Sequence, residues 1–126
     1  MQDQKKKLSD EVVEYVLTLK FEELEILSVE NLARNFNINR RKLLRSFKIE
    51  RKMTLKEFLF RVRIMQAAFF LQENEELSVK EIGEKIGYYS YNYFIHIFKR
   101  YMGASPGRYR ELKRGKYVKV KEFPFV

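Results

Sequence analysis

SVENLARNFNINRRKLLRSFKIERKMTLKEF (residues 28–58) and SVKEIGEKIGYYSYNYFIHIFKRYMGASPGRY (residues 78–109) are two versions of one pattern. They are offset by 50 positions, and by 51 after a one-residue insertion near Tyr89. Equivalent positions carry similar residues: Ser28-Val29 and Ser78-Val79, Leu32-Ala33 and Ile82-Gly83, Phe36 and Ile86, Leu43 and Phe94, Phe47-Lys48 and Phe98-Lys99, Thr54 and Ser105, Phe58 and Tyr109. A repeat of this period indicates two copies of one structural unit, here helix, short turn, helix.

Helix start signals recur along the chain, because a Ser, Thr or Asn side chain can accept a bond from an unpaired N–H of the first helical turn. Thr54 to Glu57 and Ser78 to Glu81 also form capping boxes, and Ser105-Pro106 puts proline at the first helical position. Such residues precede each periodic apolar segment: Ser9, Ser28, Asn39, Thr54, Ser78, Ser90 and Ser105. We therefore predict about seven helices: 9–20, 28–36, 39–48, 54–73, 78–86, 90–102 and 105–114.

These segments predict an all-α protein in which two helix-turn-helix subdomains are joined by a long central helix. The predicted parts are an N-terminal arm or linker (1–8), a first subdomain (9–53), the connecting helix (54–73), a second subdomain (74–114) and a basic C-terminal tail (115–126). Residues 117–121 of the tail are alternatively a short strand. The connecting helix is apolar on two sides, as expected of a strut contacted on both. Its 20 residues span roughly 30 Å, close to the ~34 Å between successive major grooves of B-DNA.

Composition narrows the possible partners. The chain has 126 residues and a net charge of +9, which favours polyanions: DNA, RNA or an acidic membrane face. It has no cysteine, so disulfides and thiolate metal sites are excluded, and a cytoplasmic location fits. No apolar run approaches the ~18 residues that cross a membrane, and no signal peptide is indicated.

The second helix of each copy separates an inward stripe from an outward face. Phe94, Ile97, Phe98 and Tyr101 recur at core spacing in one copy, and Leu43 and Phe47 in the other. Outward positions match across the offset: Arg41 with Asn92, Leu44 with Ile95, Arg45 with His96, Lys48 with Lys99. In the major groove of DNA, arginine is the commonest side chain to form two hydrogen bonds with guanine, and asparagine does so with adenine. Aliphatic side chains pack there on thymine methyl groups. The alternative is that Leu44 and Ile95 are ordinary half-buried aliphatics.

His96 is the chain's single histidine. A lone histidine is usually structural or on the surface, but this one lies on the outward face, and we interpret it as a donor to a base or phosphate. Tyr88 aligns with Ile38 and is assigned to the core.

The chain resembles the DNA-binding domain of the AraC family of bacterial transcription regulators. The resemblance covers roughly residues 9–112. It rests on a long ordered string: Ile64-x-x-Ala67, Leu77-Ser78-Val79-x-Glu81-Ile82-Gly83, Gly87-Tyr88-x-Ser90-x-x-Tyr93-Phe94, Phe98-Lys99, and Gly103-x-Ser105-Pro106-x-x-Tyr109-Arg110. The first copy, from Ser28 to Lys48, is similar to the family's more variable first unit.

The resemblance implies a sequence-specific binder of double-stranded DNA whose recognition helices (about 39–48 and 90–102) enter successive major grooves. It places Arg41, Leu44, Arg45, Asn92, Ile95 and His96 at base edges. Phosphate contacts would come from Asn39, Arg40, Lys48, Ser90, Tyr91 and Lys99. The family usually activates transcription through contact with RNA polymerase, and some members repress. Many members also carry a sensor or receiver domain that these residues lack, so we expect a stand-alone regulator or an excised domain.

Three positions depart from the family pattern. Asn39 stands where the family usually has serine, but it can still cap a helix. Arginine often stands where this chain has His96, which changes the expected base preference. Lys52 occupies the place of Gly103, so a left-handed turn there would strain a non-glycine residue.

The sequence argues against three other classes of function. An enzyme is not expected, because there is no Cys nucleophile, Gly-rich phosphate loop or metal-spaced His/Asp/Glu cluster, and no cofactor is expected. A protein-binding helical module would not need two basic faces at matched positions. RNA-binding modules expose aromatic platforms, whereas most aromatic residues here lie at core spacing.

Overall fold

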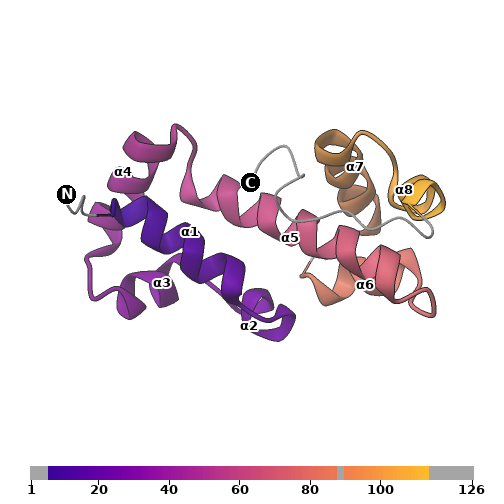
Figure 1. Ribbon diagram of the computed structural model, residues 1–126, viewed down its shortest axis with the longest axis horizontal. Helices are drawn as coiled ribbons and strands as arrows, with labels where there is room; N and C mark the ends of the chain where they lie inside the picture. Colours follow the sequence, from indigo (N-terminus) through magenta and orange to yellow (C-terminus); the bar gives the residue numbers. More distant parts are fainter. Residues whose placement is uncertain (1–5, 88–89, 114–126) are drawn as a thin grey trace, which may run out of the picture. The chain divides into compact units, whose positions relative to one another are not determined.

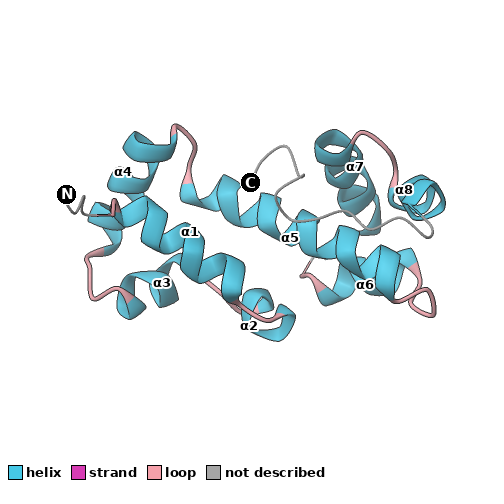
Figure 2. Ribbon diagram, viewed as in Figure 1, coloured by secondary structure: helices cyan, strands magenta, loops and turns pink. Residues whose placement is uncertain are grey.

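The computed structural model describes residues 6–87 and 90–113, and within them it contains eight helices and no strand (Figure 2). In chain order the helices are α1 (Leu8–Thr18), α2 (Phe21–Glu25), α3 (Val29–Asn35), α4 (Arg40–Arg51), α5 (Leu55–Glu73), α6 (Val79–Lys85), α7 (Tyr91–Met102) and α8 (Pro106–Lys113) (Figure 1). The all-α class is confirmed, and the pairs α3–α4 and α6–α7 are the two helix-turn-helix units. The predicted tail at 115–126 and the core assignment of Tyr88 lie outside the described residues.

Sequence reasoning missed the short helix α2. Lys20 stands at its N-cap, where no hydroxyl or amide side chain signals a helix start. The missing cap is replaced by the Glu23 carboxylate, which accepts a hydrogen bond from the Lys20 N–H at 2.8 Å. Capping from inside the first turn leaves no cap signal before the helix, which explains the omission.

Most predicted caps are present as side-chain hydrogen bonds. Ser28, Asn39, Ser78 and Ser90 each accept a backbone N–H of the helix that follows. The Ser78 capping box is complete, because the Glu81 carboxylate also accepts from the Ser78 N–H at 3.1 Å. Ser9 is the exception: α1 begins at Leu8, and Ser9 lies buried inside its first turn.

Both recognition helices end in a left-handed residue. Lys52 has a φ of 57° and Gly103 a φ of 82°, and each N–H donates to a carbonyl four residues earlier at 2.9 Å. The expected left-handed turn at Lys52 is thus present. Helix α4 reaches Arg51, three residues beyond its predicted end at 48.

The chain divides into two compact units, Met1–Leu59 and Phe60–Val126, and the division falls within α5. In the first unit, Phe47 and Phe58 are buried with their ring centroids 5.4 Å apart. The rest of that core comes from every helix of the unit: Val12, Val16, Leu24, Leu27, Val29, Leu32, Ala33, Leu43, Leu55 and Leu59.

The core of the second unit is centred on Phe98. Its ring lies edge-on to Phe94 at 5.9 Å and to Tyr109 at 5.4 Å. Gly83 of α6 leaves room for this cluster, since an added Cβ would lie 2.8 Å from the Phe94 ring. Buried side chains of α5, among them Ile64, Ala68 and Leu71, complete the core. Each unit thus holds the second helix of its helix-turn-helix pair, α4 or α7, in a fixed rotation about the helix axis.

Candidate nucleic-acid interface

Helix α4 has one buried side and one exposed basic side. Leu43 and Phe47 are fully buried, as predicted, and they fix which side of the helix faces the core. Arg41, Arg45 and Lys48 are exposed. Because the helix begins at the Asn39 cap, these cations project from its first three turns, where a recognition helix meets base edges.

Helix α7 has the same arrangement. Phe94, Ile97 and Phe98 are buried. Tyr101, the fourth predicted core residue, is half-buried and lies under the Arg61 guanidinium at 5.5 Å from the ring centroid. The outward residues are exposed: Tyr91, Asn92, His96 and Lys99.

Burial matches position by position between the two copies. Leu44 and Ile95 are both half-buried, whereas the outward polar residues of both helices are exposed: Arg41 and Asn92, Arg45 and His96, Lys48 and Lys99. Few residues on this face are identical between the two helices. The matched burial therefore comes from the packing that the two copies repeat. It places the same four outward positions along one side of each helix.

The N-cap residues of α4 and α7 keep hydrogen-bond donors that capping does not use. The Asn39 carboxamide oxygen accepts from the Arg41 N–H at 2.8 Å, and the Ser90 hydroxyl oxygen accepts from the Tyr93 N–H at 3.2 Å. Capping uses only the acceptor of each side chain, so the Asn39 amide N–H groups and the Ser90 O–H can donate to an external anion.

Arg40, a predicted phosphate contact, forms an ion pair with Glu30. Its Nε donates to the Glu30 carboxylate at 2.8 Å, and both side chains are more than half exposed. The pKa of Glu30 is held below its usual range, first by its own backbone N–H and then by Arg40. The charge of Arg40 is therefore partly compensated in the free protein, which sequence reasoning did not foresee.

A second unforeseen feature joins α1 to the end of α4. The Glu50 carboxylate accepts from the Ser9 N–H at 2.8 Å, which satisfies an otherwise unpaired N–H in the first turn of α1. Arg51 donates from Nε to the Ser9 hydroxyl at 3.3 Å and forms an ion pair with Asp10. We call Ser9, Asp10, Glu50 and Arg51 the α1–α4 clasp. In the sequence its one visible sign is that Glu50 is the first acid after the basic run of α4.

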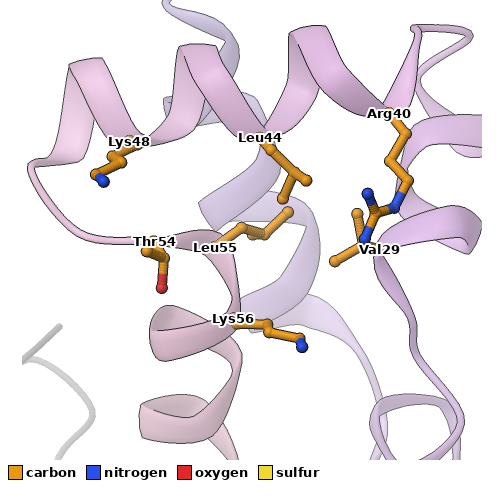
Figure 3. A pocket seen from close by; sticks show the side chains of 7 residues that line it. All are labelled: Val29, Arg40, Leu44, Lys48, Thr54, Leu55 and Lys56. Carbon is orange, nitrogen blue, oxygen red and sulfur yellow. The ribbon is translucent and has the colours of Figure 1, made fainter.

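The third unforeseen feature is an open pocket of about 290 Å³ beside α4 (Figure 3). Arg40, Leu44 and Lys48 of α4 line one side, and Thr54, Leu55 and Lys56 at the start of α5 line the other, with Val29 of α3 beside them. In Figure 3 the Leu44 side chain points from α4 toward Leu55. Leu44 is thus half-buried because it covers the apolar floor of this pocket.

In the described part of the chain, no helix is both long and apolar enough to cross a membrane. The same residues contain no group of three or more His, Asp or Glu side chains placed to hold a metal ion.

Comparison with known proteins agrees with this geometry. A family model described as a helix-turn-helix domain matches residues 32–112. The chain is 32% identical over 85 residues to the Msm operon regulatory protein of Streptococcus mutans, and 36% identical over 86 residues to the uncharacterized HTH-type transcriptional regulator YfiF of Bacillus subtilis. Each alignment covers 68% of this chain but only 30% and 27% of those relatives, so the chain spans less than a third of their length.

Solved structures show the same fold. The C-terminal domain of AraT, a response regulator from Geobacillus stearothermophilus, superposes with a TM-score of 0.69 at 27% identity, covering 94% of this chain and 96% of that one. The DNA-binding domain of AdpA, a global transcriptional factor solved in complex with a target DNA, superposes with a TM-score of 0.67 at 28% identity, covering 88% and 96%. The chain belongs to the AraC-type helix-turn-helix family of transcription regulators.

Proposed function

We propose that this chain binds double-stranded DNA sequence-specifically and thereby regulates transcription, with α4 and α7 in successive major grooves. The observation that carries the proposal is the matched outward face of α4 and α7, held in place by equivalent buried residues in two copies. The net charge of +9 and the likeness to a domain solved on its target DNA support it.

We assign roles to the outward residues from their chemistry. Arg41 and Arg45 would read guanine, and Asn92 adenine, because each can form two hydrogen bonds with that base in the major groove. Leu44 and Ile95 would pack on thymine methyl groups, and His96 would donate to a base or phosphate. Phosphates would be held by cations, by the spare donors of the caps and by one tyrosine: Asn39, Arg40, Lys48, Ser90, Tyr91 and Lys99.

The wider activity is also part of the proposal. The chain would act in the bacterial cytoplasm, without a cofactor and without catalysis. Regulation would proceed through RNA polymerase. Where the chain is an excised domain rather than a stand-alone regulator, a sensor or receiver domain would supply the signal.

The test is selection of bound duplexes from a random pool at fixed salt. We expect a bipartite site whose halves are centred about 10 base pairs apart, because recognition elements on one side of B-DNA repeat once per helical turn. Enrichment of a single short motif would contradict the two-groove arrangement, and no enrichment at all would contradict specific binding.

A further inference from the structure

The pocket between α4 and α5 differs from the rest of the outward face because it is concave and has a cationic rim over an apolar floor (Figure 3). Val29 and Leu55 are buried at the floor, and Leu44 covers it. The rim carries three cations from two helices: Arg40, Lys48 and Lys56. This combination fits a ligand that is anionic at one end and aliphatic at the other.

The rim retains positive charge after its internal pairing is counted. Glu30 partly compensates the charge of Arg40 through their hydrogen bond, and Lys56 acts on Glu30 only as a more distant charge. Over residues 6–87 and 90–113, neither Lys48 nor Lys56 forms an ion pair with an acid. Two lysines therefore remain to attract an anion.

The start of α5 adds a third attraction. This helix has 19 residues and begins at Leu55, so the N–H groups of its first turn carry partial positive charge at the pocket, which the Glu57 carboxylate of the same turn partly offsets. The Thr54 hydroxyl oxygen accepts from the Glu57 N–H at 3.0 Å, which leaves its O–H free to donate.

The size of the pocket and its position beside α4 together indicate which kind of ligand it holds. Pockets for small molecules usually measure roughly 300–1,000 Å³, so a site of about 290 Å³ suits a small group. Its α4 wall consists of Arg40, Leu44 and Lys48, which are residues assigned above to DNA. A strand whose bases are read by α4 would run past the pocket, and its backbone is a repeating phosphate joined to an aliphatic sugar.

We infer that this pocket holds one sugar-phosphate unit of the DNA strand read by α4, with Lys56 as a phosphate contact that local sequence patterns did not reveal. The inference rests on the proposed function and adds to it a contact from outside the helix-turn-helix motif. The sugar would lie on Leu55, next to the edge of Leu44, and the phosphate between Lys48 and Lys56.

The test combines protein and DNA variants on the selected site. Lys56→Ala is compared with wild type, with Lys56→Arg and with Lys20→Ala, a control at an exposed lysine of the same unit that does not line this pocket. Duplexes carry a neutral methylphosphonate at one backbone position at a time. Melting temperatures are recorded for all variants, and Lys56→Gln replaces Lys56→Ala if the alanine variant melts early.

We expect Lys56→Ala to weaken binding to all duplexes alike, by roughly threefold to tenfold, and to make the slope of log K against log salt shallower by roughly 0.9. One methylphosphonate position that weakens the wild type should have no further effect on Lys56→Ala. Lys56→Arg and Lys20→Ala should keep the wild-type slope and the wild-type methylphosphonate profile.

A Lys56→Ala variant with the wild-type slope and the full methylphosphonate penalty at every position would overturn the inference. So would specific competition by inorganic phosphate, at constant ionic strength, that depends on Lys56 while the methylphosphonate profile does not change, because the pocket would then serve a free anion. Failure of the proposed function is a separate result: wild type itself would select no sequence.

Discussion

At the scale of single residues, Arg45 and His96 occupy equivalent positions, and both side chains are exposed. Arg45→Ala should cost about 1–3 kcal/mol of binding and relax one base position in one half-site. His96→Ala should relax a position in the other half-site. The two losses should add to within about 0.5 kcal/mol, because residues without shared partners rarely couple. Repeating the selection with each variant measures this, and relaxation of the same base pair by both would reject the two-groove arrangement.

Glu30 offers a substitution that should strengthen binding. Glu30→Gln removes the carboxylate that pairs with Arg40 and lies in the field of Lys56, so both cations become more available to phosphate. We expect tighter binding and a steeper salt dependence, with Glu25→Gln, an exposed acid of α2, as the matched control.

The same carboxylate predicts a direction of pH dependence. The pKa of Glu30 is below its usual range, so the carboxylate stays ionised until the pH falls through that lowered value. Protonation of the Glu30 carboxylate should have the same effect as Glu30→Gln. The difference in DNA affinity between wild type and Glu30→Gln should therefore shrink as the pH falls. Equal affinities of the two proteins at neutral pH would show that the Arg40–Glu30 pair does not restrain DNA binding.

At the scale of elements, the two sides of α7 should separate stability from binding. Phe98 is fully buried against Phe94 and Tyr109, so Phe98→Ala should cost on the order of 3–5 kcal/mol of stability in the second unit. Lys99→Ala, one residue further, should leave the melting temperature nearly unchanged and weaken binding to all sequences alike. Thermal unfolding and a binding titration measure both, and equal thermal losses would mean that the two sides are misassigned.

The α1–α4 clasp should set the orientation of the first recognition helix. Glu50→Ala removes the acceptor for the Ser9 N–H, which as a lost helix cap should cost about 0.5–2 kcal/mol of stability. Base preference should relax in the α4 half-site and stay unchanged in the α7 half-site. Glu50→Gln keeps an acceptor oxygen and should retain most of the preference. An equal loss in both half-sites would indicate general unfolding rather than a local reorientation.

The helices show how far local patterns reach. Caps and apolar spacing predicted seven segments, and the repeat allowed the left-handed conformation of Lys52 to be expected from Gly103. The same patterns missed α2, whose cap comes from its own first turn, and the clasp, whose hydrogen bonds join residues 41 and 42 positions apart. Leu44 is similar: its spacing marked it as outward, whereas its half-burial depends on Leu55 of another helix. Long-range contacts of this kind are not encoded in any one segment.

At the scale of the whole molecule, the excess of 26 basic over 17 acidic residues should govern affinity. Each neutralised phosphate releases counterions, so log K falls with log salt at about −0.9 per phosphate on duplex DNA. Several of the basic residues are paired with acids, such as Arg40 with Glu30 and Arg51 with Asp10, and these contribute less than a free lysine does.

We therefore expect fewer phosphate contacts than the charge count suggests. Six to eight contacts predict a slope of roughly −5 to −7, for the selected site measured between low and physiological salt. A scrambled duplex should show a similar slope at lower affinity, because phosphate contacts carry little sequence information. Specificity should then appear as a vertical offset between two nearly parallel lines. A flat response on both duplexes would be incompatible with binding through the basic faces of α4 and α7, whereas a steep line without any offset would leave a protein that binds DNA by charge alone.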